Sequence, residues 1–193
     1  GPNSNTAYTV SVRAVCGADD TSFATTASFR TACGPMSVPF FEDFDSYANG
    51  YFPPCWQRLR AYGTDPSVNA QYHHSGSQAM FLLSYMDTNL FCTPSAVPLN
   101  GNEIQVSYFA NMIRGDQNTW LQAGVMTDPT DVSSFIMLDS INYSSASYGF
   151  NEREFNTSTL DASASYYVAW MFYGNYNQWS YYFSTGAIDD ISI

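Results

Sequence analysis

Carboxylate side chains gather at two places far apart in this sequence, and together their oxygens could bind a cation. The stretch FFEDFDSY carries Glu42, Asp43 and Asp45, and the stretch AIDDISI carries Asp189 and Asp190. Ca²⁺ takes about six to eight oxygen ligands, from carboxylates and backbone carbonyls. If these two stretches are neighbouring strands of one sheet, we expect a structural Ca²⁺ ion between them.

Glu42 and Asp189 are the best candidate ligands for this calcium ion, with Asp43 or Asp65 as a further one. The sequence has no D-x-D-x-D-G loop, so no local calcium motif supports the site. The alternative is that these acids cap turns, pair with arginines or face water.

Two other groups of polar residues have spacings found in enzymes. Glu152 and Glu154 lie two apart in NEREFN, and therefore on one face if this segment is a strand. Acid–base catalysis needs two carboxylates across a groove, and an exposed strand face explains the pair better. His73, His74 and Ser75 lie in HHSGSQ, but adjacency in sequence does not build a triad. We expect HHSGSQ to form a turn. We do not expect the protein to be an enzyme.

Aromatic residues are concentrated in YYVAWMFYGNYNQWSYYFS, near the end of the sequence. Sugars bind by stacking their apolar faces on such rings. Because side chains alternate along a strand, about half of these rings are expected in the core. The residues expected in the connecting loop, Tyr173, Tyr176 and Trp179, are therefore the candidate ligand-binding residues. The alternative is that the rings only fill the core and a wet sheet face.

Short segments of alternating apolar and polar residues, separated by turn clusters, run through the whole sequence. This pattern predicts an all-β antiparallel sandwich of two sheets. One short helical turn is expected in TDPTDVSSF, capped by Asp128 or Thr130. The clearest expected strands are residues 7–15, 103–112, 119–126, 134–141, 166–174 and 179–184.

The charge balance is strongly acidic, with 17 Asp and Glu against six basic residues and a net charge of -11. All six basic residues are arginine. Nucleic acids and anionic membranes need a cationic face, so neither is an expected partner. No segment has the apolar length of a membrane span. The acidic surface suits divalent cations and neutral partners such as glycans. The alternative is that the charge only keeps the protein soluble.

The composition changes near Cys33, which places a boundary near Gly34 and gives segments 1–34 and 35–193. The first segment, PNSNTAYTVSVRAVCGADDTSFATTASFRT, resembles the end of a fibronectin type III domain. The resemblance implies a β-hairpin of the last two strands of such a domain, with Tyr8 as its corner tyrosine. Because about thirty residues are too few for an independent core, we expect this hairpin to be the remnant of a cut domain or to pack on the second segment.

The second segment resembles a MAM-like jelly-roll module of surface proteins from Bacteroidetes, and it is similar to cleaved-adhesin modules. The resemblance rests on C-x5-PFFEDFDSY, PPCW, HSGSQAMFL, QVSYFANM, AGVMTDPTDVSSFIMLDSI and AIDDISI, in that order. It implies a jelly-roll sandwich whose first and last strands run side by side. Cys92 departs from the family pattern, because it stands where an apolar residue is expected.

The family resemblance also implies a function. We expect a non-catalytic adhesion or carbohydrate-binding module of a multimodular exported protein, at the cell surface or outside the cell. Its partners would be a glycan or a host or extracellular protein, together with neighbouring modules of its own chain. The alternative is a structural spacer or ancillary domain of a secreted protease or glycosidase.

The four cysteines do not form a metal-binding pattern, because none lies in a C-x-x-C pair. Cys16 and Cys33 lie too far apart along the predicted hairpin to form a disulfide with each other. The resemblance to MAM modules implies a Cys33–Cys55 disulfide. A Cys55–Cys92 pairing and four unpaired thiols are the alternatives.

Overall fold

The computed structural model describes the whole chain except residues 1, 4, 18–19, 61–64, 86–87 and 175–182. The chain divides into two compact units, Gly1–Gly34 and Pro35–Ile193, and each is described by itself. Among the described residues, no helix has the length and apolar character that crossing a membrane requires.

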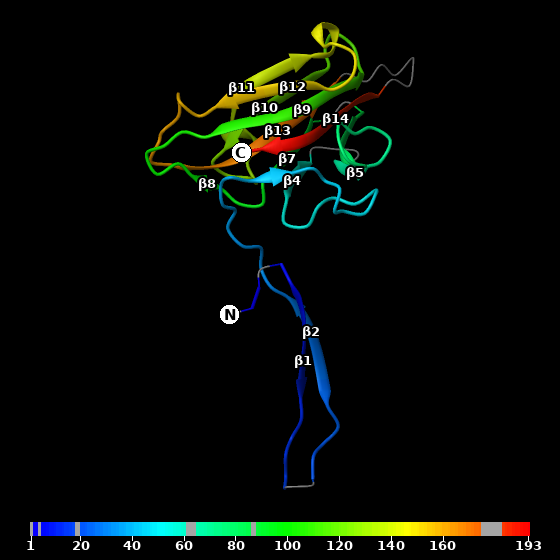
Figure 1. Cartoon of the computed structure of the whole chain (residues 1–193), viewed down its shortest axis with the longest axis vertical. Coiled ribbons are helices and arrows are strands. Elements are labelled where there is room, and N and C mark those ends of the chain that lie inside the picture. The colour runs from blue at the N-terminus through cyan, green and yellow to red at the C-terminus, as the bar shows by residue number, and fades with distance from the viewer. Residues whose placement is uncertain (1, 4, 18–19, 61–64, 86–87, 175–182) are drawn as a thin grey trace. The chain divides into compact units, whose positions relative to one another are not determined.

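The first unit is an antiparallel hairpin of β1 (Ala7–Val12) and β2 (Thr25–Arg30) (Figure 1). Tyr8 stacks on Phe29 of the opposite strand, with ring centroids 5.8 Å apart. The Tyr8 hydroxyl oxygen accepts a hydrogen bond from the backbone N–H of Asn3, at 2.8 Å. A corner tyrosine makes a bond of this kind to the backbone upstream of it. The fibronectin type III assignment itself stays a prediction.

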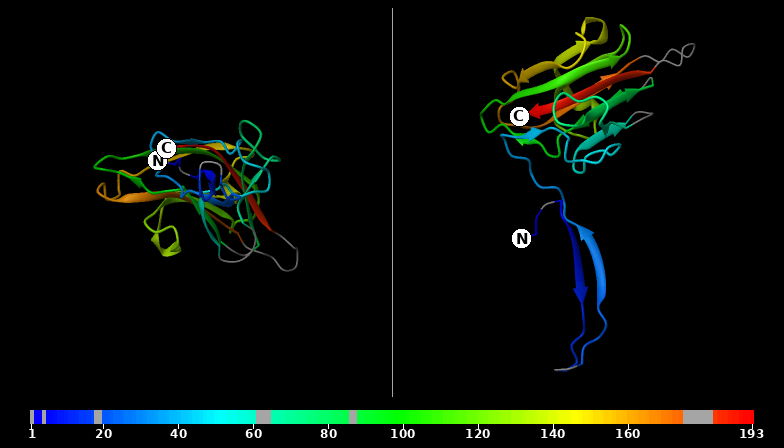
Figure 2. Two further views of the ribbon diagram at one scale, coloured as in Figure 1. Left: turned by 90° about the horizontal axis from the view of Figure 1, so that it is seen from below. Right: turned by 45° about the vertical axis from the view of Figure 1, so that its right-hand side comes forward.

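The second unit consists of two antiparallel sheets packed face to face, which confirms the predicted fold class (Figures 1 and 2). Its strands are β3 Phe41–Glu42, β4 Gln57–Arg60, β5 Ser67–Asn69, β6 Ala79–Ser84, β7 Thr88–Cys92, β8 Val97–Pro98, β9 Gln105–Arg114, β10 Trp120–Met126, β11 Phe135–Asn142, β12 Asn151–Asn156, β13 Ser165–Tyr173 and β14 Ser184–Ser192. One sheet has the order β11-β10-β13-β7-β4, with β8 beside β13. The other has the order β12-β9-β14-β6-β5, with β3 beside β14.

Aromatic rings from both sheets meet in the core between them. The Trp170 ring of β13 stacks on Phe91 of β7 at 5.2 Å and meets the edge of Tyr108 of β9 at 5.8 Å. Trp56 packs on Phe91 at 5.8 Å. All four residues are buried, because alternation along each strand sends every second side chain inward.

A polar cluster joins the two sheets at one edge of the sandwich. Asp139 of β11 accepts hydrogen bonds from the Tyr108 hydroxyl at 2.8 Å and from Arg153 Nε at 2.9 Å. Arg153 of β12 also donates through Nη2 to Asp139 Oδ1, and to the Ser140 carbonyl at 3.1 Å. Tyr108 and Arg153 belong to one sheet and Asp139 to the other, so these bonds fix the distance between the sheets.

The helical turns differ in detail from the prediction. The turn in TDPTDVSSF is a 3-10 helix, Val132–Ser134, and its N-cap is Asp131, whose side chain accepts from the Ser133 N–H. Asp128 accepts instead from the Thr130 N–H at 2.8 Å, so the predicted cap at either of these two residues is wrong. A second 3-10 turn, Tyr143–Ser145, was not predicted, and Asn142 caps it.

The cysteines fall into two classes. Cys33 and Cys55 are disulfide-bonded, whereas Cys16 and Cys92 are free thiols. Cys92 is buried in a small apolar cluster that includes Leu90, and burial raises the pKa of its thiol to about 12. Cys92 therefore acts as a small apolar residue of β7.

Candidate functional site

Glu42, the first candidate calcium ligand, serves the turn that follows β3. Its carboxylate accepts hydrogen bonds from the Phe44 N–H and from the Tyr47 hydroxyl, both at 2.8 Å. Burial raises the pKa of Glu42, while these bonds oppose the shift. Glu42 pairs with Ile191 of β14, so the opening and closing strands do run side by side. Asp43 Oδ1 accepts from the Asp45 N–H at 3.1 Å.

Asp189 and Asp190 together hold the loop of residues 73–78 against β14. Asp189 Oδ2 accepts from the backbone N–H groups of His74 at 2.7 Å and Ser75 at 3.2 Å. Asp190 binds the side chains of the same two residues, with His74 Nδ1 at 2.6 Å and Ser75 Oγ at 2.7 Å. A bulge explains how adjacent residues reach one loop: Asp190 has φ 48, and the register shifts between Asp189 and Ser192.

These contacts do not form a cation site. Hydrogen-bond donors already point at the oxygens of Glu42 and Asp189, and a cation would have to displace them. Within the part of the chain that the structure describes, no group of three or more His, Cys, Asp or Glu side chains could hold a metal ion. The calcium ion stays a prediction that these contacts do not support.

The same contacts show that the HHSGSQ segment holds no activated nucleophile. In a catalytic triad, the serine hydroxyl binds the histidine, which then takes its proton. Here Ser75 Oγ and His74 Nδ1 each bind Asp190 instead. The His74 ring stacks on Phe109 of β9, with centroids 3.5 Å apart. The segment is an ordered loop, as the sequence predicted, and its polar side chains fix its position on the sheet.

Gly76 allows this loop to close over Asp45. Gly76 has φ +58, and a Cβ atom there would lie 1.8 Å from Asp45 Oδ2. Asp45 Oδ1 accepts from the backbone N–H groups of Ser77 at 2.7 Å and Gln78 at 2.9 Å. The Gly76→Ala substitution is therefore expected to lower the free energy of unfolding by about 2 kcal/mol, measured by denaturant titration.

Gly101→Ala is the matched control for this prediction. Gly101 also has a positive φ, +82, but a Cβ atom there would meet nothing within 4 Å beyond its chain neighbours. This variant therefore suffers backbone strain alone, at about 1 kcal/mol. Equal losses in the two variants would show that the Asp45 contact does not restrict the loop.

Three of the remaining predicted residues lie on β12 and β13. Glu152 and Glu154 are both exposed on β12, opposite Phe109 and Ser107 of β9. Tyr173 ends β13, where its hydroxyl accepts from Gln122 Nε2 at 3.4 Å. The other two candidate ligand-binding residues, Tyr176 and Trp179, lie outside the described residues. Whether these three bind a ligand stays a prediction.

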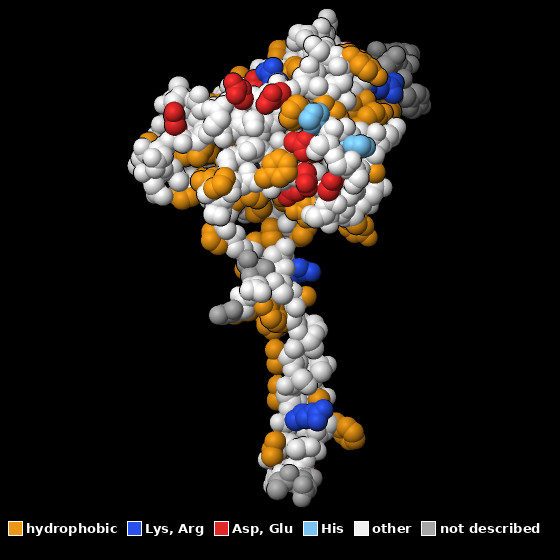
Figure 3. Space-filling model, viewed as in Figure 1, with side chains coloured by type: hydrophobic (Ala, Val, Ile, Leu, Met, Phe, Trp, Pro, Cys, Tyr) orange, Lys and Arg blue, Asp and Glu red, His pale blue; other side chains and the backbone are white. Residues whose placement is uncertain are grey.

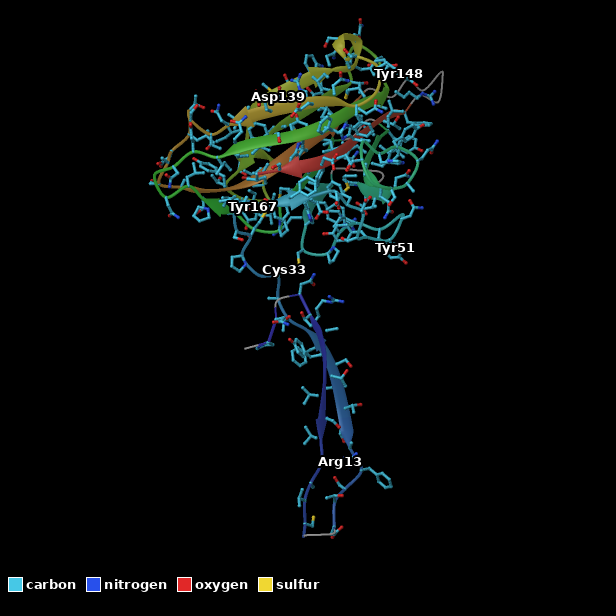
Figure 4. All side chains as sticks on the ribbon, viewed as in Figure 1. Arg13, Cys33, Tyr51, Asp139, Tyr148 and Tyr167 are labelled. Atoms are coloured by element: carbon cyan, nitrogen blue, oxygen red, sulfur yellow. The ribbon has the colours of Figure 1, made fainter. Side chains whose placement is uncertain are left out.

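A pocket that the sequence did not indicate opens beside the 73–78 loop. Its volume is about 520 Å³, and tyrosines from separate segments, Tyr72, Tyr143 and Tyr148, line it. We call it the tyrosine pocket. Tyr148 is fully exposed and labelled in Figure 4. The pocket is also lined by Asn111, Met112, Ile113, Ser144, Ala146, Ser147 and Gly149.

The walls of the tyrosine pocket are held by bonds to the sandwich. Tyr72 stacks on Phe81 of β6, with ring centroids 6.0 Å apart and planes 11° apart. Asn142 caps the turn that begins at Tyr143 and donates to the Gln117 carbonyl at 2.8 Å. Asn151 donates to the Gly149 carbonyl at 2.9 Å, just after Tyr148. The stacking on Phe81 holds the Tyr72 ring, and the two hydrogen bonds hold the backbone that carries Tyr143 and Tyr148. A preformed backbone lowers the entropic cost of binding.

The sequence did not predict this pocket, because none of the segments that line it carries a binding motif by itself. Tyr143 and Tyr148 lie in the serine-rich segment INYSSASYGF, and Tyr72 precedes HHSGSQ. HHSGSQ predicts only a turn, and the serine-rich segment carries no functional motif.

Comparison with known proteins shows which fold this is. No protein-family model matches the sequence, and no curated protein is significantly similar to it. The K2 cleaved adhesin domain of Lys-gingipain has a TM-score of 0.59 at 17% identity, over 80% of this chain and 98% of that domain. The K3 domain, from Porphyromonas gingivalis, has a TM-score of 0.59 at 16% identity, over 80% and 95%. This chain therefore shares the two-sheet β-sandwich fold of these domains.

A third similar structure is described as a carbohydrate-binding module of the β-sandwich superfamily. Its TM-score is 0.56 at 12% identity, over 96% of this chain and 73% of that one. At such low identities the similarity establishes the fold alone. The more detailed resemblance to MAM modules stays a prediction.

Proposed function

We propose that this chain is a non-catalytic carbohydrate-binding or adhesion module of an exported protein, and that the tyrosine pocket binds the glycan. The pocket is the observation that carries the proposal. Tyrosine rings offer flat apolar faces for stacking against a sugar ring, and their hydroxyl groups can donate and accept hydrogen bonds. Asn111, Ser144 and Ser147 add further polar groups around the same hollow.

The size and setting of the tyrosine pocket also fit this function. A volume of about 520 Å³ lies within the usual range for small-ligand pockets, about 300–1,000 Å³. Adhesin and carbohydrate-binding domains share the sandwich fold, which supports a binding role. The disulfide-bonded cysteines are consistent with an oxidising compartment and hence with export.

The Tyr148→Ala variant is expected to lose binding to glycans that the parent protein retains on a glycan array. Removing a stacking ring should weaken binding at least tenfold, about 1.4 kcal/mol or more. Because Tyr148 is fully exposed, the variant should keep the melting temperature of the parent. Array binding followed by calorimetric titration of the best glycan measures both effects.

Tyr51→Ala is the control, because Tyr51 is also an exposed tyrosine but lies at the other side of the same unit (Figure 4). It should bind as the parent does. An equal loss in both variants would argue against the tyrosine pocket as the site. If the parent binds no glycan, the chain is better explained as a spacer or ancillary module of a secreted protease or glycosidase.

A further inference from the structure

Two acids lie on the strands beside the part of β9 that lines the tyrosine pocket. Among the described residues that line it, none is a lysine, arginine or acid. Asn111 lies two residues after Phe109 on β9, and both strands that flank Phe109 place an acid opposite it. These acids are Glu152 on β12 and Asp189 on β14. Figure 3 shows Asp and Glu side chains gathered beside the histidines on this face.

These charges are close enough to act on a ligand in the pocket. Residues two apart on a strand are separated by about 7 Å. The screening length at physiological salt is about 8 Å, so the two acids contribute a negative potential at Asn111. An anionic sugar would be repelled there, and a cationic group would be attracted.

The described arginines near this face are engaged elsewhere. Arg153 is bound to Asp139. Arg114 follows the lining residue Ile113 in sequence, but its guanidinium lies over the Phe183 ring, 4.5 Å from the centroid. Asp139 compensates the charge of Arg153, and neither arginine lines the pocket.

The tyrosine rings add a second attraction for positive charge. The face of an aromatic ring carries negative electrostatic potential, and a cation within about 6 Å of its centre is bound by it. Several rings around one hollow are how proteins recognise ammonium groups. A neutral sugar would use the stacking surface but would gain nothing from the flanking acids.

We propose that the ligand of the tyrosine pocket is an amino sugar, a glycan unit that carries a protonated amine. The inference rests on the proposed function and specifies the class of glycan. The sugar ring stacks on a tyrosine face. The ammonium group lies among the other rings, on the side of Glu152 and Asp189.

The test compares oligosaccharides of equal length built from glucosamine, N-acetylglucosamine or glucose, at a pH where the glucosamine amine is protonated. The glucosamine oligomer should bind about tenfold more tightly than either neutral oligomer at low salt. High NaCl should remove most of this preference. Tetramethylammonium should compete, and tert-butanol, a neutral molecule of similar size, should not.

Two variants separate the contributions of charge and ring. Glu152→Gln should reduce the preference for glucosamine about threefold and weaken its salt dependence. Glu154→Gln is the matched control, because Glu154 is exposed on the same strand but pairs with Ser107, farther from Asn111. Tyr143→Leu keeps an apolar wall and should reduce the preference for the ammonium group.

Equal affinities for the three oligomers would overturn the amino-sugar inference and leave the glycan-binding function standing. A glucosamine preference that neither NaCl nor Glu152→Gln reduces would also overturn it. The array result for Tyr148→Ala decides the proposed function separately.

Discussion

Replacing Asp139 with alanine is expected to lower the free energy of unfolding by about 3 kcal/mol. Asp139 accepts from the buried Tyr108 hydroxyl and from two nitrogens of Arg153. Its loss would leave a buried hydroxyl and a largely buried guanidinium without their acceptor. Leaving a buried polar group without a hydrogen-bond partner destabilises the folded state by more than an exposed hydrogen bond stabilises it. Denaturant titration followed by tryptophan fluorescence measures the change.

Two further variants make this prediction specific. Glu103→Ala removes an exposed acid and should change the free energy of unfolding by less than about 0.5 kcal/mol. In an Arg153→Met background, Asp139→Ala should cost clearly less than in the parent, because the unpaired guanidinium is gone. An Asp139→Ala loss no larger than that of Glu103→Ala would show that the cluster does not join the sheets energetically.

The protein is expected to be more stable at mildly acidic pH than at neutral pH. Burial raises the pKa of Asp189 to about 6, from its ordinary value of 3.8. Between these two values the folded chain binds more protons than the unfolded chain, so the free energy of unfolding rises as the pH falls. The contribution of Asp189 between pH 7 and pH 4 is about 2 kcal/mol.

Other acids set the limits of this pH effect. Burial also raises the pKa of Glu42, which adds to the effect. Hydrogen bonds lower the pKa of Asp45, Asp128 and Asp161, so the stability they provide is lost as the pH falls below their ordinary value. We therefore expect maximal stability at a pH of about 4 to 5.

Denaturant midpoints measured from pH 4 to pH 7 test this prediction. Asp189→Asn should remove most of the slope between pH 4 and pH 6, since the amide does not titrate. Glu103→Gln, which changes an exposed acid, should leave the slope as it is in the parent. Parent stability that rises steadily from pH 4 to pH 7 would contradict the assignment to Asp189.

The carboxylates show where prediction from the sequence stops. The pairing of the FFEDF segment with the AIDDISI segment was predicted correctly, and Glu42 does pair with Ile191. The partners of the acids were not predicted. Asp189 binds backbone N–H groups of His74 and Ser75, which lie more than a hundred residues away in sequence. Only the folded chain decides which donors reach a given carboxylate.

The sequence by itself determined the two-sheet sandwich and the long strands β9, β10, β11 and β13, because alternation of apolar and polar residues is a local property. The same alternation predicted that Val106 and Tyr108 lie on one face, and both are buried. Only the tertiary structure decided the site. Tyr72 and the pair Tyr143 and Tyr148 come from two segments that no local rule connects, and both segments line one pocket together with Asn111 of β9. A pocket is a property of distant segments meeting in space, and its residues therefore carry no common pattern along the chain.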